Sequence, residues 1–492
     1  MDNLRTLISS LSSGEEKLIR HFYKLRDFGE YRKRVQLLDL VMQGKASDEN
    51  SLAKMMGYPS LNASYHNIKS RLKSDIVCVL LMQESSCKFN TQYAQAMFSC
   101  RRALLTGEIL LSRGVYQEGV ALLKKAARLA EKFELYAERI ITEDALRNHY
   151  AGSNDVDELN SGTEAIDDNY RLLGQMMDSK KKLYQTVFPL SGSFDEDAPH
   201  YSSREMLTEL DELENNSDSS RVVFYSKLSR LNILHSNGDL KNAIECAHGL
   251  LHDVEEDPVI MSAANQAGIH LEISNMYLRT HDFINAELHA IKAAELFKPG
   301  MLNHMRACTL RFYSQVHSGQ FDAAEETLSG VLGSRCLKEP QYEVLRQRIY
   351  LVGTWFSFAR GKMEAAFASF RNCTGLTREK GAWFYGYSLM ESMILIEKKS
   401  YEAAMYKLDA LRKSIARGKK DSAVVRTLLA ITVFRHLVRC DNNYKETAQI
   451  VSEELNRLGA PVAETTWDPT GFEIIPLDQM VRMRMTRVHK PV

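Results

Sequence analysis

The side chains that could perform catalysis in this chain do not occur in the spacings that common enzymes use. The sequence contains no GxxxxGK[ST], GxGxxG, GxSxG or HExxH pattern, which are the short signs of nucleotide binding, serine hydrolysis and zinc proteolysis. Its 14 histidines are dispersed, and His281 and His289 have no carboxylates set to complete a metal site. We therefore predict that the protein is not an enzyme and uses neither a cofactor nor a metal.

Recognition of nucleic acid is a second candidate chemistry, in the N-terminal region. The stretch SLAKMMGY places Ala53 four residues before Gly57, and a helix-turn-helix begins in this way because a small residue permits close helix contact and a glycine permits the turn. The next helix would present side chains that can reach phosphates and base edges: Tyr65, His66, Asn67, Lys69, Arg71 and Lys73. The following YPSLNAS is longer than the usual turn, so we favour a non-binding helical cap or dimerisation element, with DNA contact as the alternative.

The charge and the apolar patterning of the chain name no partner. The 492 residues hold 63 Lys and Arg against 63 Asp and Glu, and residues 1 to 80 hold 13 basic against 9 acidic side chains, a small excess beside what tight DNA binding requires. The first residues contain no long apolar segment of a signal peptide, no apolar stretch approaches ~18 residues, and the 8 cysteines are scattered. These features predict a cytoplasmic protein with reduced thiols and no membrane contact.

The elements that must position any site are helices, and they recur along the chain. The stretch FARGKMEAAFASF (358–370) has relatives at 112–123, 236–247, 279–290, 317–328, 397–408 and, more weakly, 439–450. Aligning them superposes small residues at Gly119, Ala243, Ala286, Ala324, Ala366, Ala404 and, less well, Thr447. From Ala243 onward the intervals are 43, 38, 42, 38 and 43 residues. Such a narrow band of intervals indicates an internal repeat.

Each copy is predicted to be a helix, a tight turn and a second helix. A glycine ends the first helix in four copies, because glycine adopts the left-handed conformation of a helix C-terminus without a steric penalty: Gly114, Gly238, Gly319 and Gly361. A large apolar residue follows two positions later, such as Phe321 or Tyr401. The small residue three positions beyond it allows the two helices to approach closely.

This pattern resembles the tetratricopeptide repeat (TPR), whose units carry Gly–x–aromatic–x–x–Ala at the turn between their two helices. The resemblance covers about residues 92 to 135 and 221 to 457, although the interval here is near 40 residues where the family repeats every 34. It implies an all-α protein, a right-handed α-solenoid of about seven to nine helix pairs, and a binding role without catalysis.

The predicted organisation has five parts. They are a small helical N-terminal domain (1–90), the first helix pairs (91–190), an acidic linker (191–221), the main array (222–458) and a C-terminal cap and tail (459–492). Within the linker we expect one amphipathic helix over REMLTELDELE. A solenoid exposes the apolar face of its last repeat, so we expect the tail to cover it with Trp467, Phe472, Ile474, Ile475 and Leu477.

The resemblance also implies a binding groove lined by the first helices of successive units. The equivalent positions form one row at Asn232, Asn275, Tyr313 and Trp355 and another at Tyr225, Arg306 and Arg348. In peptide-binding members of the family, asparagine bonds the ligand backbone and basic residues hold its carboxylates, since an amide donates and accepts at once and a guanidinium forms a fork. The alternative is that Tyr313 and Trp355 pack between helices and the asparagines are solvated.

We therefore expect a non-catalytic scaffold that binds a protein or peptide on its concave face, with homo-oligomerisation as a further expectation. A bacterial transcription regulator, with DNA-binding N-terminal helices and a TPR-like sensing or dimerisation array, is the alternative.

Overall fold

The computed structural model describes residues 2–9, 11–24, 29–44, 48–82, 91–187, 203–379, 381–415, 422–460 and 465–485. All regular elements in these ranges are helices, so the all-α prediction is confirmed for them. None of the described helices combines the length and the apolar character that a membrane crossing requires. Contacts divide the chain into two compact units, Met1–Phe89 and Asn90–Val492, and each is described by itself.

The described part of the first unit contains five helices around one core. They are α1 (Asp2–Ser9), α2 (Ser13–Lys24), α3 (Gly29–Met42), α4 (Glu49–Met55) and α5 (Ala63–Met82). Apolar side chains from all five helices fill the core, and Ile19, Leu37 and Leu72 have no exposed surface. The buried Arg34 of α3 donates to the Asp75 carboxylate of α5 at 2.7 Å. This ion pair ties the two helices together beside the apolar core.

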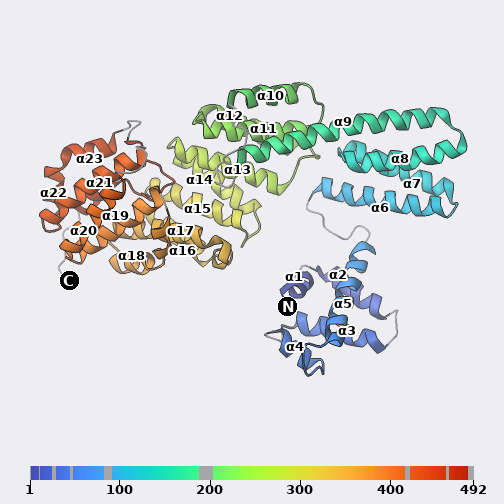
Figure 1. The fold of residues 1–492 in the computed structure, drawn as a ribbon, viewed down its shortest axis with the longest axis horizontal. Coiled ribbons are helices and arrows are strands. Elements are labelled where there is room, and N and C mark those ends of the chain that lie inside the picture. The colour runs from blue at the N-terminus through green and yellow to red at the C-terminus, as the bar shows by residue number, and fades with distance from the viewer. Residues whose placement is uncertain are drawn as a thin grey trace. The chain divides into compact units, whose positions relative to one another are not determined.

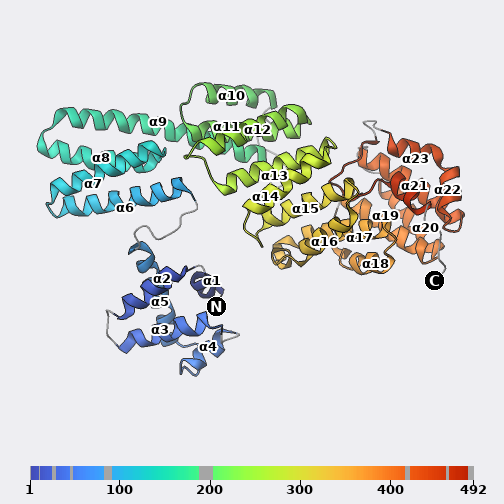
Figure 2. The same cartoon turned by 180° about the vertical axis from the view of Figure 1, so that it is seen from behind.

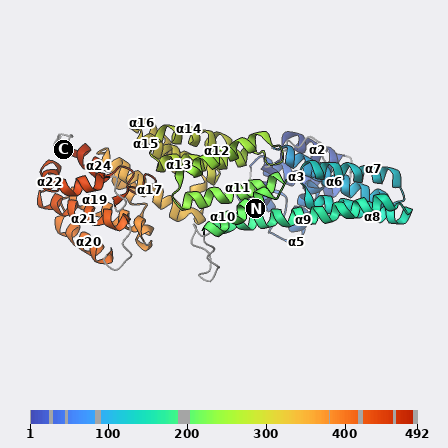
Figure 3. The ribbon, with the colours of Figure 1, turned by 90° about the horizontal axis from the view of Figure 1, so that it is seen from above.

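The described residues between 91 and 256 form the first seven helices of the second unit. They are α6 (Gln92–Ser112), α7 (Tyr116–Lys132), α8 (Tyr136–Ser153), α9 (Val156–Val187), α10 (Ser203–Asn215), α11 (Ser220–Ser236) and α12 (Leu240–Glu256). Helix α10 covers the amphipathic helix expected in the acidic linker, whereas residues 188–202 of that linker lie outside the described part of the chain. Helix α9 is longer than its partner α8, and its C-terminal part packs against α11 (Figure 3).

The remaining helices continue in the same manner. They are α13 (Ala263–Arg279), α14 (Phe283–Leu296), α15 (Leu302–His317), α16 (Phe321–Gly333), α17 (Glu343–Ala359), α18 (Met363–Phe370), α19 (Ala382–Glu397), α20 (Tyr401–Ile415), α21 (Ser422–Arg439), α22 (Tyr444–Ile450), α23 (Ser452–Gly459) and α24 (Leu477–Met485). Most helices pack chiefly against the helices that precede and follow them in the chain (Figures 1 and 2). Short 3-10 turns lie between α16 and α17 and between α18 and α19, which lengthens these units.

A left-handed residue ends the first helix of each pair. Gly238 has a φ of +78° and Gly319 a φ of +75°, as expected for glycine at this position. Where the repeat has no glycine, His281 and Lys399 adopt the same region, with φ of +62° and +59°. In every case the next amide bonds back across the helix end, as from Asp282 N to the Tyr277 carbonyl at 2.9 Å. The turn is therefore the same with and without glycine.

The aligned small residues lie where paired helices touch. Six of the aligned residues have no exposed surface: Ala243, Ala286, Ala324, Ala366, Ala404 and Thr447. The first pair uses glycine on both helices: a Cβ built on Gly107 would lie 2.9 Å from the Leu123 side chain and 3.1 Å from the Gly119 carbonyl oxygen. Small residues thus set the close approach of the helices, which pack in consecutive pairs.

The C-terminal loop (residues 465–476) and α24 return to the packed helices. Ile474, Ile475 and Leu477 are buried, and α24 contacts α22, α23 and α17. The loop itself reaches further, because its Trp467 ring lies 4.9 Å from the His317 ring of α15. This chain segment, which is remote in sequence, therefore contributes to the face formed by the first helices of the pairs.

Candidate functional site

One pocket lies across the first helices of four consecutive pairs. It has a volume of about 230 Å³. Its lining comprises Leu271, Glu272, Asn275, Met305, Arg306, Thr309, Leu310, Tyr313, Leu345, Arg348, Ile349, Trp383 and Thr470. These residues come from α13, α15, α17 and α19 and from the C-terminal loop. The pocket brings together four of the seven groove residues that the repeat alignment selects, namely Asn275, Arg306, Tyr313 and Arg348.

A guanidinium is held in a fixed position at one side of this pocket. Arg348 donates to the Glu379 carboxylate at 2.7 Å, and its guanidinium lies 5.2 Å from the centre of the Trp383 ring. The ion pair and the cation–π contact together restrict the long side chain. Among the described residues, the buried Nε of Arg348 has no hydrogen-bond partner. A ligand oxygen that reached it would satisfy this donor.

The pocket lining also carries a carboxyl group beside a second arginine. Burial raises the pKa of Glu272 above its ordinary value, and the positive charge of Arg306 opposes this shift. His235 of α11 lies 3.8 Å from the same carboxylate, and burial lowers the pKa of His235. Arg306 is exposed, and no described carboxylate forms an ion pair with it. It is therefore the cation of this pocket that an acidic ligand can reach.

The remaining polar groups of the pocket differ in burial and in whether they already form hydrogen bonds within the protein. Tyr313 is buried, and burial raises the pKa of its phenol. The Thr309 hydroxyl donates to the carbonyl of Met305 in its own helix at 2.9 Å. Asn275 is half-buried in the pocket wall. Its amide can donate and accept hydrogen bonds, which suits it to a peptide backbone.

Three of the predicted groove residues lie elsewhere. Trp355 is buried in the core of the second unit, where its ring lies 5.7 Å from that of Phe472. Tyr225 and Asn232 of α11 face α9, because this long helix continues past α8: Lys180 Nζ lies 5.4 Å from the Tyr225 ring centre, and the Asn232 amide donates to Thr186 Oγ1 at 3.2 Å. We assign these three side chains to packing between elements, not to the pocket.

The structure also places the six candidate DNA contacts, all on α5. His66, Asn67 and Arg71 are exposed, and Lys73 is half-buried. Lys69 forms an ion pair with Glu49 of α4. Tyr65 has no exposed surface, and burial raises its pKa to about 12. Tyr65 is therefore a core residue of the first unit, because this face of the first turn of α5 packs against the other helices.

The predicted turn before α5 has a definite conformation. Ala53 is buried, and Gly57 has a φ of +82°. The amide of Tyr58 donates to the carbonyl of Ala53 at 2.9 Å. Asn62 then caps α5 by accepting from the Tyr65 amide at 2.9 Å. The seven residues between α4 and α5 (56–62) make this connection longer than a tight helix-turn-helix corner.

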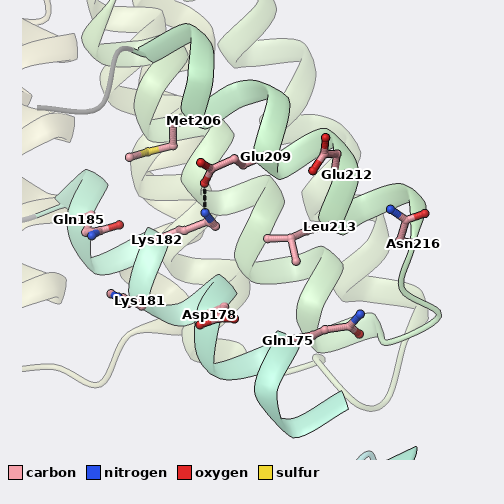
Figure 4. A pocket seen from close by; sticks show the side chains of 10 residues that line it. All are labelled: Gln175, Asp178, Lys181, Lys182, Gln185, Met206, Glu209, Glu212, Leu213 and Asn216. Atoms are coloured by element: carbon pink, nitrogen blue, oxygen red, sulfur yellow. Dashed lines mark hydrogen bonds and ion pairs between the residues drawn. The ribbon is translucent and has the colours of Figure 1, made fainter. Parts of the chain in front are cut away.

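A second pocket, of about 470 Å³, lies between α9 and α10 (Figure 4). Polar side chains of both charges line most of it: Gln175, Asp178, Lys181, Lys182, Gln185, Glu209, Glu212 and Asn216. Lys182 is already paired with Glu209, as the dashed line in Figure 4 shows. Because its charged side chains already neutralise one another and only two of its ten lining residues, Met206 and Leu213, are apolar, this pocket is a weaker candidate than the first.

Sequence reasoning missed nine of the thirteen residues that line the first pocket, among them Glu272, Trp383 and Thr470. Glu272 lies one helical turn before Asn275 on the same face of α13, so helical spacing alone could have selected it. Trp383 lies near the start of α19, outside the two aligned rows. Thr470 comes from the C-terminal loop, and no local signal in the sequence links this loop to the first helices of the array.

No protein-family model matches this chain, and no curated protein matches its sequence. Among the described residues, no group of His, Cys, Asp and Glu side chains is arranged to hold a metal ion.

Proposed function

We propose that the protein is a non-catalytic scaffold that binds a protein or peptide segment, with the helix pairs forming a TPR-like solenoid and the first pocket forming part of its groove. The single observation that carries this proposal is the convergence of Asn275, Arg306, Tyr313 and Arg348. They lie on three successive first helices, up to 73 residues apart in the chain, and the repeat alignment selects them independently of the structure.

The chemistry of the pocket fits a peptide better than a small charged metabolite. Apolar walls from Leu271, Leu310 and Ile349 surround a few polar groups, as is usual where a side chain is bound and oriented. Arg306 provides an accessible positive charge and Asn275 provides an amide for a peptide group. A ligand segment with an acidic side chain next to an apolar one satisfies both parts of the lining.

Selection of ligands from a displayed random peptide library tests the proposal. A selected peptide should bind the full chain, and Asn275→Ala combined with Arg306→Ala should weaken its binding at least tenfold, with a melting temperature within a few degrees of wild type. Arg371→Ala is the matched control, because Arg371 is exposed at the end of α18, a second helix. Unchanged binding in the double variant would contradict this site.

Transcription regulation is the second candidate function, and one observation favours it. The residues that follow the buried Ala53 and the left-handed Gly57 form a helix of 20 residues that exposes His66, Asn67 and Arg71. A gel-shift experiment with the full chain and random duplex DNA at low salt tests this function. If Arg71→Ala does not weaken a shift, or if no shift occurs, this candidate is rejected.

A further inference from the structure

The C-terminal loop occupies part of the same face that forms the pocket. Thr470 lines the pocket, while the Trp467 ring meets the ring of His317 on α15 and the Phe472 ring meets that of Trp355 on α17. These contacts lie on successive first helices. The loop therefore sits where a segment bound along this face would continue from the pocket.

The loop holds its own shape through internal hydrogen bonds. Trp467 Nε1 donates to the carbonyl of Glu473 at 2.7 Å. The Asp468 carboxylate accepts from the amide of Thr470 at 2.9 Å and from its hydroxyl at 2.7 Å, and the Gly471 amide donates to the Asp468 carbonyl at 3.1 Å. These bonds define a compact turn with an aromatic side chain near each end. A separate peptide of the same sequence can form them too.

The contacts that the loop tip (Trp467 to Phe472) makes with the helices are mainly contacts between side chains. The Trp467 ring lies 4.9 Å from the His317 ring and 5.7 Å from the His281 ring. One hydrogen bond joins His317 Nε2 to the Pro469 carbonyl at 2.9 Å. Trp467 and Phe472 are both only half-buried. Among the described residues, three aromatic contacts, two from Trp467 and one from Phe472, and one hydrogen bond thus hold the loop tip.

The receiving surface is shaped for an aromatic ring. A Cβ built on Gly386 of α19 would lie 2.3 Å from Phe472 Cγ, so the ring rests directly on the helix backbone, and any larger residue at 386 would displace it. Beneath it, Trp355 is 1% exposed, and its Nε1 has no hydrogen-bond partner among the described residues. A different occupant that carries an acceptor would satisfy this buried donor, which favours exchange.

The base of the loop is fastened much more firmly than its tip. Glu473 forms a buried two-point ion pair with Arg426 of α21, with distances of 2.7 and 3.0 Å, and the Leu477 amide donates to the same carboxylate at 2.6 Å. The residues from Trp467 to Phe472 can therefore leave the face while the base and α24 stay in place.

From these observations we propose that the C-terminal loop is an intramolecular ligand of the groove, and that the partner is a peptide turn with an aromatic side chain near each end, which competes with the loop for the face formed by His317, Trp355 and Gly386. This inference rests on the proposed function and specifies its ligand. Because a tethered segment acts at an effective concentration in the millimolar range, the loop weakens every competing ligand of this face.

A labelled synthetic peptide with the loop sequence TTWDPTGFEII tests the inference in trans. Its binding to the full chain is measured by fluorescence anisotropy for wild type and for the variant Trp467→Ala with Phe472→Ala. We expect the variant to bind the peptide at least tenfold more tightly than wild type, because its own loop no longer fills the site. A peptide with both aromatic residues replaced by alanine should bind neither protein.

A second substitution locates the binding site. Adding Gly386→Ala to the double variant should abolish the gain, since the new Cβ occupies the position of the phenylalanine ring. If the double variant does not fold, Trp467→Ala alone is measured by the same criterion, because this ring is half-buried and its loss leaves the core intact.

The inference is overturned if a variant with the wild-type melting temperature binds the peptide no better than wild type, or if Gly386→Ala leaves the gain unchanged. Failure of this experiment and failure of the proposed function are distinguishable. If Asn275→Ala with Arg306→Ala weakens a library-selected peptide while the loop peptide does not bind, the scaffold function stands and only the role of the loop is rejected.

Discussion

Arg426 and Glu473, 47 residues apart in the chain, form a two-point ion pair inside the C-terminal part of the array. Arg426 Nη2 and Nε lie 2.7 and 3.0 Å from the two carboxylate oxygens, and both residues are buried. Arg426 Nη1 also donates to the carbonyls of Leu458 and Thr465, at 2.8 and 2.7 Å. One guanidinium therefore joins α21, the end of α23 and both ends of the C-terminal loop.

We predict that Glu473→Gln lowers the free energy of unfolding by about 3–5 kcal/mol, because it leaves the arginine charge buried without its partner. Urea denaturation followed by tryptophan fluorescence measures the loss. Lys362→Met is the matched control: its ion pair with Glu325 is half-exposed, so the change should stay below about 1 kcal/mol. Equal effects of the two substitutions would contradict the structural role assigned to the buried pair.

Enlarging a small residue between paired helices should destabilise the array. We expect Ala366→Leu to cost about 1–3 kcal/mol, since Ala366 has no exposed surface and the added carbons must push α17 and α18 apart. The neighbouring Ala365 is exposed on the same helix, so Ala365→Leu should change the free energy of unfolding by less than about 0.5 kcal/mol. Thermal and urea denaturation of the two variants measure the free energy of unfolding at these adjacent positions, and equal losses would contradict the prediction.

Two helical glycines should respond to alanine in opposite directions. A Cβ on Gly107 meets the Leu123 side chain at 2.9 Å, whereas a Cβ on Gly174 of α9 meets nothing within 4 Å. We therefore predict that Gly107→Ala lowers the melting temperature, because α6 and α7 must separate. Gly174→Ala should raise stability by up to about 1 kcal/mol through helix propensity alone. A gain in both variants would show that the α6–α7 contact tolerates a larger side chain.

Buried histidines should make stability fall in mild acid. His270 Nδ1 lies 2.9 Å from His289 Nδ1, and burial, assisted by the charges of Lys292 and His248, lowers the pKa of each to about 4. Burial also lowers the pKa of His317 to about 4, against the opposing effect of its bond to the Pro469 carbonyl. In the unfolded chain these groups titrate near a pKa of about 6.5.

Between about pH 6.5 and 4, the unfolded state therefore binds more protons than the folded state. The contribution of these neutral histidines to the free energy of unfolding is fully present above this window and is lost as the pH falls through it. Each histidine contributes a slope of up to about 1.4 kcal/mol per pH unit. His289→Gln should make the measured slope shallower by up to this amount, and His252→Gln, at an exposed position of α12, should leave it unchanged. Urea denaturation at a series of pH values measures these slopes.

Much of the helical architecture was predictable because its determinants are local. The glycines at 114, 238, 319 and 361 ended helices as predicted, and the small residues at intervals near 40 were predicted to lie between paired helices, where the structure buries them. The amphipathic helix of the acidic linker was recognisable from its apolar periodicity. In each case a few side chains that are close in sequence decide the conformation, so a short stretch of sequence is enough to predict it.

The candidate site was predictable only in part. Asn275, Arg306, Tyr313 and Arg348 follow from the register of the repeat, since equivalent helix positions face the same side. That register also selected Tyr225 and Asn232, which α9 covers because it is 32 residues long, whereas its partner α8 has 18. The length of one helix, which the repeat pattern does not specify, decided which positions of the row remain accessible.

By itself, the sequence determined the helical class, the repeat and the residues at which its helices pair, because periodicity and glycine conformation are properties of short segments. Only the tertiary structure decided which chain segment covers the face formed by the first helices of the pairs. Thr470 lines a pocket together with residues of α13, about 200 positions earlier in the chain. Phe472 lies against Gly386 of α19, and Glu473 pairs with Arg426 of α21. These placements depend on the shape of the packed helices and on one buried ion pair, which no local sequence pattern records.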